Sequence, residues 1–339
     1  AGMTAGWDRL WGKLTGGGLP SAQHMAVLRF VGIGADESMN AFNDGLMETL
    51  TSKLTQLEQY EGARWVVPAS EIRSRDIQSV GDARDAFNVT IAITGSIQRR
   101  GTGYRLIINV VNAKTERQLK SAIIDDPMID ASVFQDATVV KLAEMLDLTI
   151  QPQTREALTA GGTTKATAYE VYLQGRGYLQ QRGMVENIDR SIELFRQAID
   201  QDSLYALAYA GLAEAYWRKY DETQEIEWVD DAKATCVDAI RLNDMLAPVH
   251  VTLGIINRGT GHNDDAIGNF QRALELDPAN YEARLELAVV YRALGRAEQA
   301  EETYLKAIEL RPEYWAGYTS LGYFYYRQGR LEDAEKMFR

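Results

Sequence analysis

Apolar and small residues recur at helical spacing through the C-terminal half of the chain. In Tyr281–Tyr314 they predict two helices, which are separated at Gly295 and closed by Pro312. Small residues at Ala288 and Ala300 allow the two antiparallel helices to approach closely, and proline cannot continue a helix. This stretch therefore predicts a helix–turn–helix unit.

The same offsets recur before and after this stretch, so the unit is one member of a repeat. The predicted units are Ala168–Tyr205, Ala206–Leu246, Ala247–Asn280, Tyr281–Tyr314 and a truncated unit from Trp315 to Arg339. The second unit fits if about seven residues are inserted around Asp221–Glu227. The pattern resembles the tetratricopeptide repeat, which implies an all-α superhelical solenoid over residues 168–339, with four repeats plus one truncated repeat. Because the last unit is truncated and residue 1 is not methionine, we expect the chain to be part of a longer protein.

Residues 25–150 follow a different pattern, in which short apolar runs alternate with helical stretches. The predicted strands are Met25–Val31, Ala63–Val67, Thr90–Gln98, Tyr104–Val111 and Glu116–Ile124. Helices are predicted around Phe42–Leu57, at Ala69–Arg75, at Val80–Phe87 and at Ala131–Leu146. This order predicts an α/β domain with one mixed sheet of the α+β type, covered by helices on one or both faces.

Two shorter segments flank this domain. Residues 1–24 are predicted to be a linker or juxtamembrane segment, in which Trp7, Leu10, Trp11 and Leu14 share one helical face. The tryptophans could lie at a bilayer interface beside a missing span, or the helix could pack on the next domain. Residues 151–167 are polar and contain glycine, and they are predicted to connect the two halves.

The charge of the chain argues against one class of partner. With 36 Lys and Arg against 48 Asp and Glu, the net charge is −12, so nucleic-acid binding is not expected. No run of 18 apolar residues predicts a membrane span within this sequence. The single Cys236 occupies a core position of a repeat helix and is predicted to be buried.

Motifs for catalysis are missing from the sequence. There is no phosphate-binding loop of the G-x-x-x-x-G-K-[ST] type and no kinase H-R-D or D-F-G signature. His24, His250 and His262 are too scattered to predict a metal site. The stretch Gly32–Asp36 between a strand and a helix could bind a nucleotide, but a tight turn with Asp36 near the helix start explains it more simply. We therefore predict a non-enzyme with no catalytic residues, cofactor or metal.

The N-terminal half also resembles a known family. The stretches AVLRF, DGLMETLTSKLTQLEQYEGARWVVPASEIRSR and TGSIQRRGTGYRLIINVVNAKTERQL are similar to the TolB-like α/β domain, although Arg29 replaces the proline of the family's AVLPF strand. This domain precedes tetratricopeptide repeats in some bacterial transmembrane serine/threonine protein kinases and nucleotide cyclases. The resemblance implies the sensing region of a signalling receptor on the extracytoplasmic (periplasmic) side, with a cytoplasmic location as the alternative. A periplasmic envelope-assembly scaffold and a nucleotide- or small-molecule-binding enzyme domain are the other hypotheses.

The repeat resemblance also implies a binding surface. In stacked tetratricopeptide units, the first helices line a concave groove that faces the ligand. The predicted groove residues are Arg176, Trp217, Arg218, Arg258, Arg292, Tyr323, Tyr326 and Arg327. Arginines and aromatic rings suit a protein or an acidic or C-terminal peptide. Alternatively, the arginines only pair with neighbouring acids such as Glu214, Glu282 and Glu286. A homodimer is also possible, because the truncated repeat leaves apolar surface near Phe338.

Overall fold

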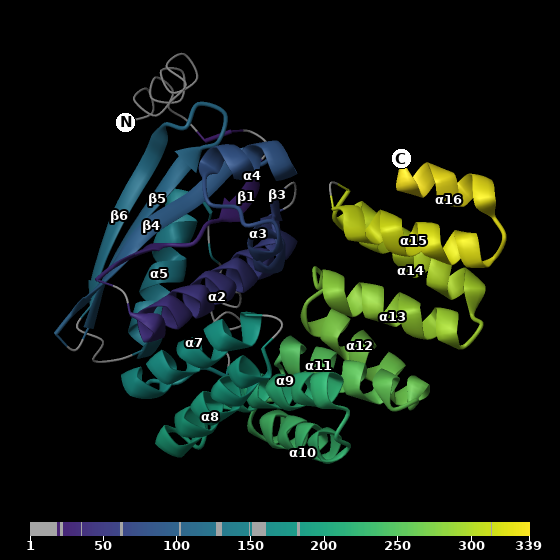
Figure 1. Ribbon diagram of the computed structural model, residues 1–339. Coiled ribbons are helices and arrows are strands. Elements are labelled where there is room, and N and C mark those ends of the chain that lie inside the picture. The colour runs from purple at the N-terminus through teal and green to yellow at the C-terminus, as the bar shows by residue number, and fades with distance from the viewer. Residues whose placement is uncertain are drawn as a thin grey trace. The chain divides into compact units, whose positions relative to one another are not determined.

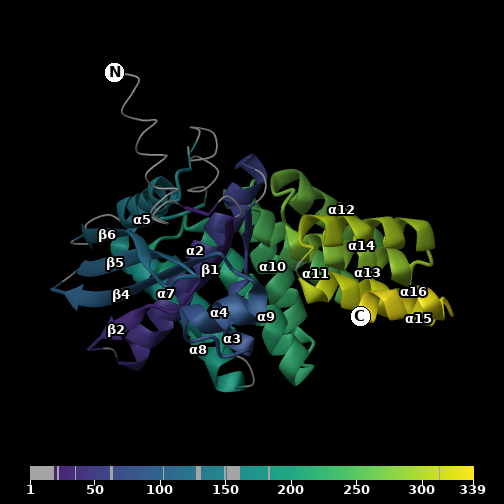
Figure 2. The ribbon, with the colours of Figure 1, turned by 90° about the horizontal axis from the view of Figure 1, so that it is seen from above.

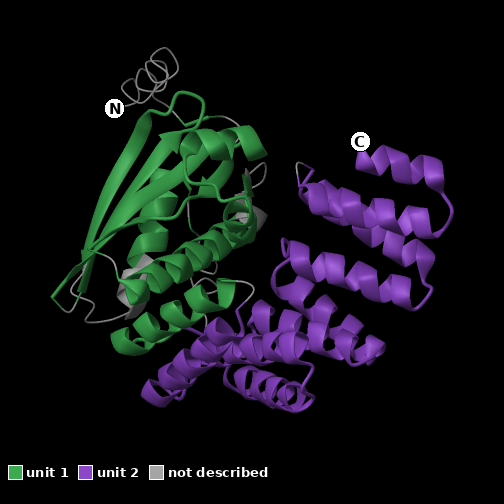
Figure 3. Ribbon diagram, viewed as in Figure 1, with its two compact units in different colours: residues 1–159, 163–181 green, residues 160–162, 182–339 purple. Residues whose placement is uncertain are grey.

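The computed structural model divides the chain into two compact units (Figure 3). It describes residues 19–20, 23–34, 36–61, 64–101, 103–126, 131–148, 150, 161–181, 184–312 and 314–339. The first unit comprises residues 1–159 and 163–181, and the second comprises residues 160–162 and 182–339. The predicted helical face of Trp7, Leu10, Trp11 and Leu14 lies outside the described residues, as does most of the predicted connector.

A mixed sheet with the order β3-β1-β4-β5-β6 forms the framework of the first unit, and β2 also pairs with β4. The strands are β1 (Gln23–Val27), β2 (Val31–Ile33), β3 (Arg64–Val66), β4 (Ile91–Arg100), β5 (Gly103–Asn112) and β6 (Gln118–Asp126). The pairs β1–β3, β1–β4 and β2–β4 are parallel, whereas β4, β5 and β6 are antiparallel neighbours. Figures 1 and 2 show β4, β5 and β6 in this order. The predicted mixed sheet is therefore confirmed.

Alternation along the strands determines which face of the sheet is covered. In β5, Leu106, Ile108 and Val110 are fully buried, whereas the intervening Arg105 and Ile107 are partly exposed. Successive strand residues point to opposite faces, so one face of this half of the sheet carries the core. The hairpin between β4 and β5 turns at Gly101, whose φ of 61° is left-handed and therefore favours glycine.

The first strand is shorter than predicted. Instead of one strand over Met25–Val31, β1 ends at Val27 and β2 begins at Val31. Between them, Arg29 forms an ion pair with the buried Asp44, with 2.9 Å between Nε and Oδ1. This is the position at which the resembling family has proline. The two short strands therefore pair with different parts of β4. Strand β1 pairs with the first residues of β4, and β2 pairs with residues farther along β4.

Five helices in the described part of the first unit accompany the sheet. They are α2 (Glu37–Glu61), α3 (Ala69–Ser74), α4 (Val80–Phe87), α5 (Ala131–Met145) and α7 (Ala166–Gln180). The predicted apolar positions of α2 from Phe42 to Leu57 are buried. Helix α4 has the predicted bounds, because Ser79 and Asp82 form a capping box at its start and Asn88 ends it in a left-handed conformation.

Helix α7 packs on α2 within the first unit. Two glycines allow their backbones to touch: a Cβ atom at Gly45 would lie 1.9 Å from the carbonyl oxygen of Leu173, and one at Gly177 would lie 1.8 Å from that of Ala41. Polar contacts add to this packing. The Tyr104 hydroxyl donates to Glu170 on α7 over 2.8 Å, so α7 is also bonded to the sheet.

The second unit is a stack of antiparallel helix pairs (Figure 1). Its helices are α8 (Val185–Gln201), α9 (Ala206–Thr223), α10 (Glu227–Leu242), α11 (Ala247–Gly259), α12 (Asn263–Leu276), α13 (Tyr281–Ala293), α14 (Ala297–Leu310), α15 (Trp315–Arg327) and α16 (Leu331–Phe338). Phe270 and Phe338 fill the space over Gly254 and Gly322 within their pairs, with ring carbons 2.6 Å from an added Cβ. The predicted helical solenoid is confirmed. None of the helices in the described part of the chain is long and apolar enough to cross a membrane.

The glycine contact between α2 and α7 generates a stability prediction. We expect Gly177→Ala to lower the free energy of unfolding by about 1–3 kcal/mol, because the added methyl group would force two backbones apart. The measurement is urea unfolding of the whole chain, followed by circular dichroism.

Gly268→Ala in α12 is the matched control. An added Cβ meets nothing within 4 Å at that helical position, so the substitution should raise stability by about 0.5–1 kcal/mol through helix propensity. If Gly177→Ala also raised stability, the backbone contact between α2 and α7 would not restrict this site.

Candidate functional site

Seven of the eight predicted groove residues lie on the first helices of the second unit. Trp217 and Arg218 belong to α9, Arg258 to α11 and Arg292 to α13. Tyr323, Tyr326 and Arg327 belong to α15. Because α9, α11, α13 and α15 are successive neighbours, we call these seven residues the first-helix surface. The eighth residue, Arg176, lies on α7 in the first unit.

Two arginines of the first-helix surface form ion pairs within it. Arg218 Nη2 lies 2.6 Å from Glu214 Oε1, one turn earlier on α9. Arg258 Nε lies 2.7 Å from Glu286 Oε2, which connects α11 to α13. Burial raises the pKa of Glu286, and the nearby Arg258 opposes the rise. Both guanidinium groups therefore already have a carboxylate partner.

Trp217 acts as a packing residue between α9 and α11. A Cβ atom at Gly259 would lie 2.4 Å from the indole Cη2, so only glycine leaves room for the ring there. The indole also packs against Tyr220, with 5.1 Å between ring centroids. Arg292 lies near the buried Tyr304, and its charge opposes the rise of the Tyr304 pKa that burial causes.

The α15 end of the first-helix surface is the most exposed. Tyr323 and Tyr326 are 59% and 58% exposed, and their ring centroids are 6.1 Å apart. Arg327 follows them and is exposed, and it forms no ion pair with any described residue. This helix therefore presents two aromatic rings and a guanidinium group together.

An ion-pair network holds α15 in place beneath these exposed side chains. Arg330 Nη1 lies 2.7 Å from Glu301 Oε2 on α14, and its guanidinium lies 4.1 Å from the centroid of the Tyr325 ring. The Tyr325 hydroxyl donates to Glu301 over 2.8 Å. Burial, assisted by this carboxylate, raises the pKa of Tyr325 to about 12. The exposed tyrosines thus stand on a firmly packed helix.

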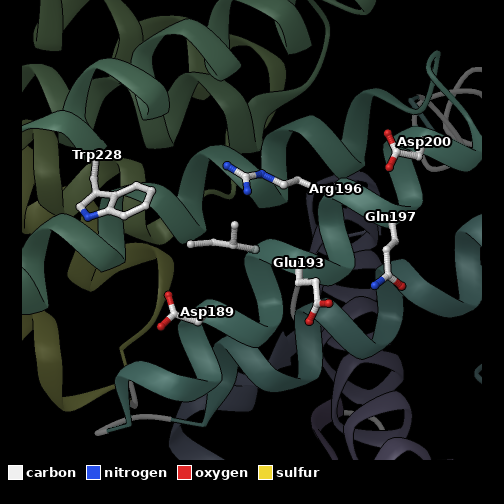
Figure 4. Close-up of a pocket in the computed structure, with 7 residues that line it drawn as sticks. Asp189, Glu193, Arg196, Gln197, Asp200 and Trp228 are labelled. Carbon is white, nitrogen blue, oxygen red and sulfur yellow. The ribbon is translucent and has the colours of Figure 1, made fainter.

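Sequence reasoning did not find a cavity beside α8 (Figure 4). It has a volume of about 410 Å³, and its lining consists of one face of α8 and the first turn of α10. The lining residues are Asp189, Ile192, Glu193, Arg196, Gln197, Asp200 and Trp228. The sequence feature that could have pointed to this cavity is the insertion in the second repeat. With the insertion, the first helix of that repeat, α9, has 18 residues, whereas α11, the first helix of the next repeat, has 13.

Several charged groups of this cavity already have partners. Arg196 donates from Nη2 to the Tyr216 hydroxyl over 2.7 Å, and Lys219 Nζ lies 2.6 Å from Asp189 Oδ1. The Trp228 ring stacks on Tyr216 with 5.7 Å between centroids. These contacts join α9 to α8 and to the start of α10, so we assign the cavity a structural role.

The residues that the sequence offered as candidates for nucleotide binding, metal binding or catalysis have local structural contacts. Asp36 Oδ1 accepts a hydrogen bond from the Met39 backbone over 2.8 Å, and thus caps the start of α2. His250 is buried, with Nε2 3.0 Å from the Asp244 carbonyl oxygen. Cys236 is fully buried, which raises the pKa of its thiol to about 12. Within the described residues, no group of three or more His, Cys, Asp or Glu side chains could hold a metal ion.

Comparison with known proteins assigns a family to the repeats. The tetratricopeptide repeat family matches residues 172–237 and 251–314 in one form, and residues 303–336 in another. These parts of the chain are therefore tetratricopeptide repeats, and the second unit is a scaffold of the tetratricopeptide type. No curated protein matches the chain.

Solved structures similar to the chain include those of MamA, YrrB and PilF. MamA is 25% identical with a TM-score of 0.38, over 45% of this chain and 85% of that one. YrrB, described as a TPR protein with an unusual peptide-binding site, is 22% identical with a TM-score of 0.37, over 50% of this chain and 82% of that one. PilF of Pseudomonas aeruginosa is 19% identical with a TM-score of 0.43, over 51% of this chain and 73% of that one. At these TM-scores the likeness carries no functional argument.

The ion pair between α11 and α13 generates a pH prediction. The pKa of Glu286 is raised above its ordinary value of 4.5 in the folded chain. The stabilising contribution of Glu286 is therefore complete at a pH below 4.5, and it is lost as the pH rises through the folded-state pKa. Relative to the wild type, we expect Glu286→Gln to gain stability as the pH rises above about 4.5. Urea unfolding at several pH values measures this difference.

Glu309→Gln on the exposed side of α14 is the control for this series. Because its side chain is exposed, this substitution removes a carboxyl outside the buried pair of Arg258 and Glu286. An identical pH dependence for the two variants would show that burial of Glu286 does not control stability.

Proposed function

We propose that the chain is a non-enzymatic protein-interaction and sensing region, in which the first-helix surface binds a peptide or protein partner. The observation that carries the proposal is the group of Tyr323, Tyr326 and Arg327 on α15. Large aromatic side chains normally become buried, and here two lie side by side in solvent next to a guanidinium that forms no ion pair with the described residues. Such groups contribute most of the binding energy in protein interfaces.

The arrangement favours a particular chemistry for the partner. Tyrosine rings offer a large contact area and lose little conformational entropy on binding. A free guanidinium binds a carboxylate through two parallel hydrogen bonds. Since Arg218 and Arg258 are already paired with Glu214 and Glu286, recognition of an acidic group is concentrated at the α15 end. The proposed partner is a peptide with apolar or aromatic side chains beside a carboxylate.

The cellular context of the proposal comes from the N-terminal half. Its resemblance to the TolB-like domain, together with the tetratricopeptide repeats, supports the non-catalytic part of a bacterial signalling receptor. The parent protein would be a serine/threonine kinase or a nucleotide cyclase, with this part on the periplasmic side. The alternative is an envelope-assembly scaffold in the periplasm.

The complete coding sequence and the location of the chain test this context. A receptor requires a membrane-spanning segment and a catalytic domain upstream, whereas a scaffold requires an export signal without them. An alkaline phosphatase fusion to the C-terminal end should be active, because this enzyme works only outside the cytoplasm. An inactive but expressed fusion would place the chain in the cytoplasm and overturn the periplasmic assignment.

The first-helix surface generates a binding prediction. Peptides selected on the full chain from a random phage-displayed library should lose affinity by about tenfold or more for the Tyr323→Ala/Tyr326→Ala variant. Arg327→Ala should weaken the peptides that contain an acidic residue and leave the others unchanged. Fluorescence anisotropy with labelled peptides measures both effects. All three side chains are exposed, so the variants should keep the wild-type circular dichroism spectrum.

Leu305→Ala/Lys306→Ala on α14 is the matched control. These side chains are also exposed, but they lie on a second helix of a repeat. Binding should therefore be as in the wild type. Equal binding by wild type, control and the tyrosine variant would show that the selected peptides bind elsewhere and would overturn the proposal.

A further inference from the structure

Strand β6 forms one end of the sheet in the first unit. It pairs with β5 on one side, and no described strand pairs with its other side. Figures 1 and 2 show it at the outer edge, beyond β5. A strand at a sheet edge presents unpaired backbone N–H and C=O groups, which can pair with a further strand.

The edge strand also borders an apolar row on the less covered face of the sheet. The register aligns Val31, Ser96, Ile107 and Ile123 across β2, β4, β5 and β6. Val31 and Ile123 at the two ends of this row are 65% and 61% exposed. By contrast, the neighbouring Ile124 on the opposite face is buried. The row thus ends in a large apolar side chain at the open edge.

The middle of β6 lacks the sequence features that usually protect an edge strand from pairing. Residues 121–124 include no proline and no charge, and the only irregularity in the pairing of β5 and β6 occurs earlier, at Val110 and Val111. Charges are confined to the two ends, with Lys120 near the start and Asp125 near the finish. Natural edge strands are usually blunted by central charges, proline or bulges.

We propose that β6 pairs antiparallel with β6 of a second copy of this chain, with a two-fold axis at Ile123. The two Ile123 side chains then face each other, and Ser121 of each copy faces Asp125 of the other. In this antiparallel arrangement Asp125 faces the uncharged Ser121, and Lys120 and Asp125 keep their ion pairs with Asp147 and Arg105 of their own chain. Parallel pairing in register would instead place Asp125 against its own copy, which is destabilising.

This arrangement buries the exposed Ile123 side chain and pairs the open backbone edge of β6. The apolar row continues from Ile107 and Ile123 of one copy into the same residues of the other, and the sheet gains a full set of backbone hydrogen bonds at its edge. The contact uses the same strand on both copies, as two-fold interfaces do. It involves only the first unit, so it is independent of the proposed binding by the first-helix surface.

A cysteine placed on the proposed axis tests the pairing. Directly opposed residues of antiparallel strands have Cα atoms about 4.5–5.5 Å apart, within the about 4.4–6.8 Å that a disulfide spans. Ile123→Cys should therefore form a covalent dimer under mild oxidation, seen as a doubled mass on non-reducing gels. The native Cys236 is fully buried and should not compete, which oxidised wild-type protein verifies.

Ser121→Cys is the matched control, since it lies two residues away on the same strand face. In the proposed register, position 121 of the second copy lies four residues along the strand from the point opposite position 121 of the first. The two cysteines would therefore be about 14 Å apart, so Ser121→Cys should form few covalent dimers. Equal cross-linking of both variants would overturn the register. The absence of cross-linking in Ile123→Cys would overturn the pairing itself.

Light scattering provides a second test without oxidation. The wild type should have twice the monomer mass of 37.9 kDa, and Ile123→Lys should raise the dimer dissociation constant at least tenfold. A monomeric wild type at all concentrations would overturn the proposal. So would a dimer that Phe338→Glu abolishes and Ile123→Lys leaves intact, because that dimer would form through the last repeat.

Discussion

Close packing against helix glycines, where a Cβ atom would collide with the neighbouring helix, is the constraint on which both units depend. In the first unit, Gly45 and Gly177 bring α2 and α7 so near that a single Cβ atom would collide with a carbonyl oxygen. In the second unit, glycines such as Gly254 and Gly322 receive a phenylalanine ring from the paired helix. Because such contacts leave little freedom of position, the outward side chains are held on a rigid scaffold.

The charge balance of the repeats explains why few of the arginines are available for binding. In an acidic chain, an arginine on a helix surface readily meets a carboxylate, and Arg218 and Arg258 do so. The pair of Arg258 with Glu286 joins adjacent first helices, and it therefore acts within the scaffold. Arg327 differs, because it is exposed beside Tyr323 and Tyr326 and forms no ion pair with any described residue.

The chain thus offers two surfaces that would recognise partners by different physical means. The first-helix surface uses side chains, and its specificity depends on the aromatic rings and the guanidinium of α15. The edge of β6 uses the backbone, and its specificity depends on the register of the paired strands. Because the surfaces belong to separate units, each can be altered without changing the other.

The sequence alone determined the repeats, the mixed sheet and most element boundaries, because helical spacing, glycine turns and the capping box at Ser79 act over a few residues. It could not show that α7, which begins the first predicted repeat, packs on α2, or that Arg29 interrupts the first strand to pair with Asp44. Nor could it distinguish Arg258, which is paired with Glu286, from Arg327, which forms no ion pair with the described residues. These outcomes depend on contacts between residues far apart in the chain, and only the tertiary structure decides which partners come within reach.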